Sequence, residues 1–451
     1  MRLFTRFGVA IVLCLGLSIG LGAVPRLEAH RTTILAGRAP HTFPPGSLQL
    51  YRPAANWARL QPLDPATLRD RRGPALQLGP GAAANAYPAI VPTADGSRFA
   101  VMNNIHPNHQ PTASQDLTLQ LFDARSGKPL SSAHHPAVPV WISGISADGA
   151  MVYGLRADSN LALPCASRSF YLLDARTGRI IRHFTINAAP WGQLLMGPNL
   201  HRLYTVTASD HNNACGPQWS YSLTIAAYDL DTGARAQSVR LKGILAGSWE
   251  TMRSIHGDRI GAMWIPGIAL SPDGSQLAVL DEHSDTLTVL HAATLRVAGK
   301  ENVSRPTTTG DRIVAALGLA PPVADAKGQW NGTQLQLQYT ADGHSLLVTG
   351  ARLHPDPRHH YAVSQSLGLQ AIDIGSGQIK AWLDDRKQVI AVWPAPGGTA
   401  VYSSVQSWTR RDGWLITLRR HDPVTLRVRA WRTFSDSTWT NLVLLQARHG
   451  S

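Results

Sequence analysis

The stretch IALSPDGSQLAVLDEHSDTLTVLHAATLRV, residues 268–297, contains short apolar segments separated by two tight turns and one polar loop. Residues 271–274, Ser-Pro-Asp-Gly, form the first turn, in which Pro presets φ and Gly is free to adopt a positive φ. Residues 286–290 alternate Thr with Leu and Val, which is typical of a strand. Residues 291–294 form the second turn, and residues 295–297 begin another strand. The stretch therefore predicts a four-stranded antiparallel meander.

Both turns recur along the chain, and a repeat of this kind is the strongest indicator of a fold. Copies of the first turn begin at Thr93, Ser146, Gly197, Thr340 and Ala395. Copies of the second turn begin at Asp64, Asp123, Asp174, Asp229, Asp373 and Asp422. With the turn at His291, the second turn occurs seven times. We therefore expect an all-β fold, a single β-propeller of seven four-stranded antiparallel blades.

The repeat at residues 268–297 resembles the YVTN-type β-propeller repeat, a relative of the WD-type (WD40-like) repeat. The resemblance extends loosely over residues 45–447 and implies a propeller, although no WD dipeptide ends any repeat. The last second turn is followed by an apolar segment, residues 440–447, with no further first turn. We expect this segment to complete the blade begun by residues 47–63, so that the N- and C-terminal strands pair and close the ring.

The N-terminal residues 1–24 form a targeting segment. Arg2 and Arg6 precede an apolar run over residues 8–24, which is long for a signal peptide and at the short limit for a membrane-spanning anchor. Both alternatives remain open, and both export the rest of the chain. Residues 25–45 form a linker, and residues 46–451 form the propeller. The sequence therefore predicts an extracytoplasmic protein, either secreted or anchored by its N-terminal segment.

Two cysteines, Cys165 and Cys215, lie beyond the targeting segment. Both occur in the link between the second and third strands of adjacent repeats, and export permits a disulfide. We expect a Cys165–Cys215 bridge, and the alternative is a pair of free thiols.

The formal net charge of the chain is +13. An exported basic domain is attracted to anionic lipid headgroups, acidic wall polymers or acidic glycans. Because no compact basic run stands out, a solvated basic surface remains the alternative. We expect a protein or an anionic cell-envelope partner and no specific nucleic acid. We expect contact with the membrane only through the N-terminal segment, and the sequence does not predict an oligomeric state.

The repeats carry their insertions at one place. The link between strands two and three is extended in five repeats, and the connections at residues 242–264 and 299–333 are long. All this extra chain falls on the face opposite the two tight turns. Since loops on a rigid scaffold carry function, we expect the binding surface on that face.

The aspartates of the turns are expected to bond local backbone amides rather than to perform chemistry. The other candidates are loop residues that could converge over the central channel and bind zinc, copper or another divalent ion. The alternative is a set of solvated loop side chains. The candidate metal ligands are His106, His109, Asp210, His211, Glu282 and His283.

Tryptophan is abundant, at 13 residues, and several tryptophans lie in or near the long loops. Aromatic rings on a loop face can stack on sugars or anchor a partner, and the alternative is that they pack the loops down. The candidate binding residues are Trp219, Trp249, Trp330, Trp408 and Trp414.

We expect a binding or scaffold module without chemistry and without a cofactor. The chain has no nucleophile elbow, no phosphate-binding glycine loop and no haem-attachment motif. The open alternative is a metal-dependent, lactonase-like hydrolase, which resemblance to other propellers implies, with a divalent ion in the central channel.

Overall fold

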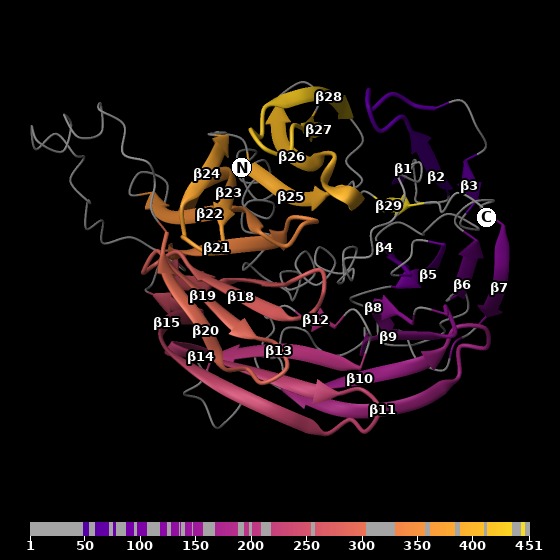
Figure 1. Ribbon diagram of the computed structural model, residues 1–451, viewed down its shortest axis with the longest axis horizontal. Coiled ribbons are helices and arrows are strands. Elements are labelled where there is room, and N and C mark those ends of the chain that lie inside the picture. The colour runs from indigo at the N-terminus through magenta and orange to yellow at the C-terminus, as the bar shows by residue number, and fades with distance from the viewer. Residues whose placement is uncertain are drawn as a thin grey trace, which may run out of the picture.

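The computed structural model describes residues 48–446 except 54–58, 72–74, 78–86, 94–96, 106–117, 124–127, 135, 137–139, 147, 157–166, 188–193, 198–200, 209–217, 254–257, 304–329, 357–360, 384–387, 410–412 and 435–442. The fold is a β-propeller of four-stranded antiparallel blades, with its sheets arranged around a common centre (Figure 1). No helix in these described ranges is long and apolar enough to cross a membrane. The expected targeting segment and linker lie outside the described residues.

The meander predicted from residues 268–297 is confirmed. Strands β17 (Gly267–Leu270), β18 (Gln276–Asp281), β19 (Thr286–His291) and β20 (Val297–Asn302) pair in this order. All but one residue of β18 and of β19 are buried, whereas no residue of β20 is. Neighbouring sheets cover both faces of the inner strands, which is why almost every residue of β18 and β19 is buried.

Three further meanders have the same strand order. They are β4 (Tyr87–Pro92), β5 (Arg98–Ile105), β6 (Thr118–Asp123) and β7 (Pro129–His134); β8 (Val140–Ile145), β9 (Met151–Arg156), β10 (Ser167–Asp174) and β11 (Ile180–Asn187); and β25 (Gln388–Pro394), β26 (Val401–Thr409), β27 (Gly413–His421) and β28 (Val428–Phe434). The first strand of each meander lies toward the centre in Figure 1 and the fourth toward the periphery, so we call the fourth the outer strand.

The described strands form six sheets, so the prediction of seven separate blades is wrong. One sheet has nine strands. One end contains β12 (Leu195–Met196), β13 (Arg202–Ala208), β14 (Gln218–Asp229) and β15 (Arg235–Arg253), and the other contains β21 (Trp330–Tyr339), β22 (Ser345–Asp356), β23 (Tyr361–Asp373) and β24 (Ile379–Leu383).

Strand β16 (Asp258–Ile265) joins the two ends of this sheet. It pairs antiparallel with residues 247–253 of β15 and parallel with β21. The cause is the length of β15, which continues for 19 residues instead of ending with its own meander. Residues 242–264, expected to form a blade connection, therefore contribute to a long hairpin.

The two ends of the described chain share a sheet. Strand β29 (Val443–Gln446) pairs antiparallel with β1 (Leu48–Pro53), with Leu444 opposite Leu50. Strands β2 (Arg59–Leu63) and β3 (Leu76–Gln77) continue that sheet. The predicted pairing of the N- and C-terminal strands is therefore present.

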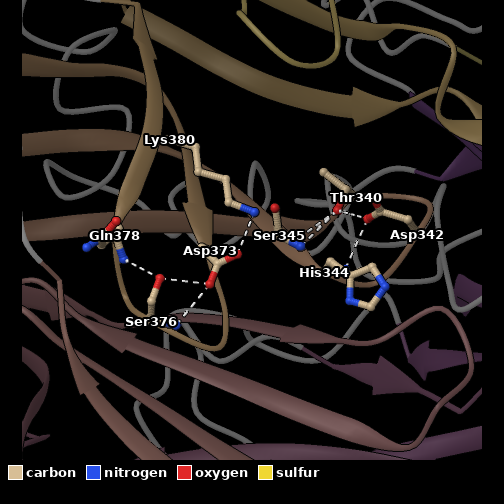
Figure 2. A network of polar contacts seen from close by, with 8 residues as sticks. All are labelled: Thr340, Asp342, His344, Ser345, Asp373, Ser376, Gln378 and Lys380. Carbon is tan, nitrogen blue, oxygen red and sulfur yellow. Dashed lines mark hydrogen bonds and ion pairs between the residues drawn. The ribbon is translucent and has the colours of Figure 1, made fainter.

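Three first turns, those at Ser146, Ser271 and Thr340, are each held by a hydroxyl group and a carboxylate. The Oγ of Ser271 donates to Asp273 Oδ1 at 2.5 Å and accepts from the N–H of Gln276 at 2.9 Å. In the turn at Ser146, the corresponding hydroxyl bond holds the pKa of Asp148 below its usual range. Figure 2 shows the equivalent bonds of Thr340 and Asp342.

The second turns use their first residue in a similar way. Asp174 Oδ1 accepts from the N–H of Arg176 at 3.0 Å, and from the N–H and the hydroxyl of Thr177, both at 2.8 Å. The backbone bond from Thr177 is the main cause that lowers the pKa of Asp174. The predicted structural role of the turn aspartates is therefore confirmed where they are described. Equivalent bonds occur at Asp64, Asp229, Asp373 (Figure 2) and Asp422.

In the six second turns whose fifth residue is described, that residue adopts the left-handed conformation and faces the preceding sheet. Three repeats use glycine there, and in the turn at Asp229 a Cβ on Gly233 would lie 2.9 Å from Phe184. Three other repeats use leucine at a φ of 52–59°: Leu68, Leu295 and Leu426. Each of these leucines is buried in a cluster shared with the preceding sheet, and burial therefore offsets the backbone strain.

Side chains of one sheet also bind backbone carbonyls of the next second turn. The hydroxyl of Tyr204 donates to the carbonyl of Ala292 at 3.2 Å, and that of Tyr402 donates to the carbonyl of Pro65 at 2.9 Å. Both hydroxyls thus satisfy a carbonyl of the adjacent repeat and fix the spacing between sheets.

Leu295→Gly tests the balance at the left-handed position. Glycine relieves the strain of a positive φ but removes a side chain that is only 2% exposed. We expect the variant to be about 2 kcal/mol less stable, because a lost buried leucine outweighs the relief. Urea unfolding gives the free energy, and Val424→Ala is the control, since Val424 is 76% exposed in the same kind of turn. An unchanged or more stable Leu295→Gly protein would show that strain dominates.

Candidate functional site

The face opposite the tight turns is built by hairpins of unequal length. In the minimal sheet, β18 and β19 have 6 residues each, whereas β14, β22 and β23 have 12, 12 and 13 residues. The expectation of long loops is corrected here, because much of the inserted chain continues as paired strand. We call the surface made by these extensions the long-hairpin face.

The five candidate binding tryptophans all lie in strands of this face rather than in loops. Trp408 of β26 and Trp414 of β27 are direct register partners. Trp219 lies in β14, Trp249 in β15 and Trp330 in β21. The structure places their backbones near the ends of the long hairpins, and their side chains lie outside its description.

Most of the candidate metal ligands also lie outside the described residues, namely His106, His109, Asp210 and His211. Glu282 and His283 lie in the short link between β18 and β19, where Glu282 is half-buried and His283 is exposed. Within the described ranges, no group of three or more His, Cys, Asp or Glu side chains could hold a metal ion. The described part of the chain thus gives the divalent-ion expectation no support.

Asp281 is the buried carboxylate of that same link and was not a sequence candidate. It is 3% exposed, and its Oδ2 accepts from the Ser284 hydroxyl at 2.7 Å while its Oδ1 accepts from the N–H of His283 at 3.2 Å. Burial raises the pKa of Asp281 and these hydrogen bonds oppose the rise. The carboxylate therefore shapes the link between β18 and β19 on the long-hairpin face. The Asp-Glu-His-Ser sequence gave a hint, because Asp two or three residues before such donors favours a local turn.

Ser403 and His421 form a buried hydrogen-bonded pair that resembles a Ser–His dyad, because the hydroxyl donates to the imidazole. Ser403 Oγ lies 2.7 Å from His421 Nε2, and His421 Nδ1 lies 2.9 Å from the carbonyl of Leu426. A carbonyl only accepts, so Nδ1 carries the proton, and in the neutral ring Nε2 accepts from Ser403. His421 is 0% exposed and Ser403 is 1% exposed, which leaves no access for a substrate. The hydrogen bonds of this pair instead link β26 and β27 to the second turn that begins at Asp422.

The exposed apolar side chains lie elsewhere. Every large hydrophobic side chain that is exposed in the described residues lies on an outer strand or a second turn: Leu130, Ile180, Ile181, Val297, Trp382, Val424, Val428 and Trp431. Sequence reasoning missed this distribution, because the residues are spread over five repeats of the chain. The available indication was an apolar residue soon after most second turns.

The expected disulfide partners, Cys165 and Cys215, lie outside the described residues. Comparison with protein-family models and with curated proteins finds no match. Among solved structures, the chain is similar to hydrazine synthase of Kuenenia stuttgartiensis, with 16% identity and a TM-score of 0.41 over 73% of this chain and 75% of that one. This similarity is too low to transfer a function.

Asp281 gives a prediction about pH. Burial raises its pKa in the folded state, so the unfolded state ionises first as pH rises. The stability of the natural protein should therefore fall, relative to Asp281→Asn, from about pH 4 up to the raised value and then stay constant. Asp281→Ala leaves two donors without their acceptor and should cost about 1–3 kcal/mol.

Urea unfolding at pH 4, 6 and 8 measures these differences. Asp285→Asn is the control, because Asp285 is an exposed carboxylate of the same link. A stability difference between Asp281 and Asp281→Asn that is independent of pH would contradict the buried-carboxylate account.

Proposed function

We propose that the protein is an exported binding or scaffold module that holds a protein or an anionic cell-envelope ligand on its long-hairpin face. The observation that carries the proposal is the concentration of strand extensions on that face, above sheets whose inner strands are buried on both sides. Extended hairpins on a rigid scaffold provide a preorganised surface, which reduces the entropic cost of binding.

The charge of the chain supports an anionic partner or a partner with an acidic surface. The formal net charge is +13, and complementary charge raises the rate of association and the selectivity for such partners. The tryptophans of β14, β15, β21, β26 and β27 add the residue type most enriched where binding energy concentrates.

Export is part of the proposal. The apolar run over residues 8–24 behind two arginines supports it. A Cys165–Cys215 disulfide would fit an exported domain. It has indirect support, because β10 begins at Ser167 and β14 at Gln218, soon after the two cysteines, in sheets that follow each other along the chain.

We also propose that the seven sequence repeats are of the YVTN type and are arranged in the six sheets, and that the β1–β29 pair closes the ring. Two observations support this. The second turn occurs seven times in the sequence. The nine-stranded sheet contains two complete meanders, one on each side of β16.

Deletion of residues 443–451, which removes β29, tests the closure. The remaining edge of β1 would lose its partner strand, so we expect the whole propeller to unfold at a lower urea concentration in one cooperative transition. Deletion of residues 447–451 alone, after the strand, is the matched control. Equal midpoints for both truncated proteins would argue against closure by this pair.

The binding function is tested with the double variant Trp408→Ala/Trp414→Ala. Immobilised full-length protein is incubated with a solubilised envelope fraction, and the affinity for each captured component is measured. If the hairpin anchors the ligand, the double variant should bind it about 30-fold or more weakly, as expected for central aromatic anchors. Trp431→Ala, on an outer strand, should bind normally.

Elemental analysis of the full-length protein, purified without chelator, distinguishes the hydrolase alternative from a binding module. One equivalent of a divalent ion together with unchanged ligand capture by the double variant would favour a metal-dependent hydrolase over a binding module.

A further inference from the structure

A basic residue follows the left-handed position of every second turn by one to three residues. Five of these residues are arginines that are exposed and make no side-chain hydrogen bond or ion pair within the described part of the chain: Arg69, Arg179, Arg235, Arg296 and Arg427. The other two are Lys128 and Lys380, and Lys380 pairs with Asp373 at 2.5 Å (Figure 2). We call these seven residues the rim belt.

The exposed apolar residues accompany the rim belt. Val297 and Val428 directly follow Arg296 and Arg427, and Ile180 directly follows Arg179. Seven of the eight exposed large hydrophobic side chains in the described ranges lie within three residues of a belt residue, and Trp431 lies four residues from one. The basic and apolar residues therefore lie together in each repeat, at the edge of the tight-turn face, and we call the whole set a band.

Protection of open sheet edges explains only part of this band. Charged side chains on outer strands prevent edge-to-edge pairing of sheets. That role does not account for valine at 76% exposure or tryptophan at 66% exposure beside the charges. Exposed apolar surface beside polar residues is typical of protein or membrane interaction sites when it forms a larger patch.

We infer that the rim belt docks the tight-turn face of the propeller on an anionic lipid bilayer. Arginine side chains attract anionic headgroups, and neighbouring valine, isoleucine and tryptophan side chains insert at the boundary between headgroups and acyl chains. The repeat places one such pair on each of several sheets around the molecule (Figure 1). Charges spread over the whole width of a face match a flat anionic surface better than a single small ligand.

This docking goes beyond the proposed ligand binding and uses the opposite side of the molecule. With the tight-turn face on the bilayer, the long-hairpin face points away from it and stays accessible. Failure of the docking would leave binding on the long-hairpin face untouched.

Hydrogen exchange of the full chain with lipid vesicles tests the inference, because its local readout is independent of the N-terminal segment. Vesicles of phosphatidylcholine, with or without phosphatidylglycerol, are titrated into the protein. We expect anionic vesicles to slow exchange in residues 174–182, 291–299 and 422–431 and to leave residues 243–253 unchanged. Neutral vesicles should have no such effect.

Arg179→Glu/Arg296→Glu should raise the lipid concentration needed for half-maximal protection by about 25-fold or more, since each basic residue contributes about fivefold. The matched control, Lys242→Glu/Lys300→Glu, changes two exposed basic residues that lie on outer strands farther from the second turns. It should shift the lipid concentration for half-maximal protection less. Val297→Ser/Val424→Ser should also weaken docking, through lost apolar insertion.

Three results would overturn the inference. They are an absence of lipid-dependent protection, equal protection by neutral vesicles, and equal protection by soluble heparin without any effect of the valine variant. The last result would identify a soluble polyanion as the occupant.

Discussion

The contact between each second turn and the preceding sheet is the constraint on which the arrangement of the sheets depends. The left-handed residue of the turn points at that sheet, and the space there decides which residue fits. Where the neighbouring backbone is close, only glycine fits: a Cβ on Gly377 would lie 2.6 Å from the carbonyl oxygen of Asn302. Where the neighbour recedes, leucine fills the gap, as Leu426 does against Leu347 and Leu369. Glycine and leucine are therefore two solutions to one packing problem, and they keep successive sheets in register.

The same logic explains how much of the fold the sequence could predict. Turn chemistry is local, so the hydrogen bonds of Asp174 and the meander at residues 268–297 follow from a few neighbouring residues. The extent of β15 is not local, because its last residues are strand only through their pairing with β16. The length of an inserted segment does not reveal whether that segment forms a loop or a longer hairpin. For this reason the six-sheet arrangement could not be predicted from the repeat count.

The candidate sites also differ in whether the local sequence or the packing between sheets determines them. Asp281 lies two or three residues from its donors, so its structural role could have been predicted from the local sequence. The Ser403–His421 pair joins residues on neighbouring strands, and its burial is set by packing between sheets. The rim belt depends on residues about fifty positions apart in the sequence, such as Arg179 and Arg235. A search for basic runs does not find charges that recur only once in each repeat.

The turns also explain why a band with both signs of charge presents mainly its positive side chains. Five second-turn carboxylates accept two or three bonds from their own turn, as Asp422 does from Val424 and Thr425. These bonds direct the carboxylate toward the backbone and lower its pKa, with the Arg429 side chain as the largest cause at Asp422. Five of the basic residues that follow are arginines, which are exposed and make no side-chain hydrogen bond in the described part of the chain, whereas Lys380 pairs with Asp373. The same short sequence that stabilises each turn thus separates its charges, with carboxylates directed inward and guanidinium groups outward. Repetition of that turn around the molecule places one basic residue after each second turn, at corresponding positions of successive repeats.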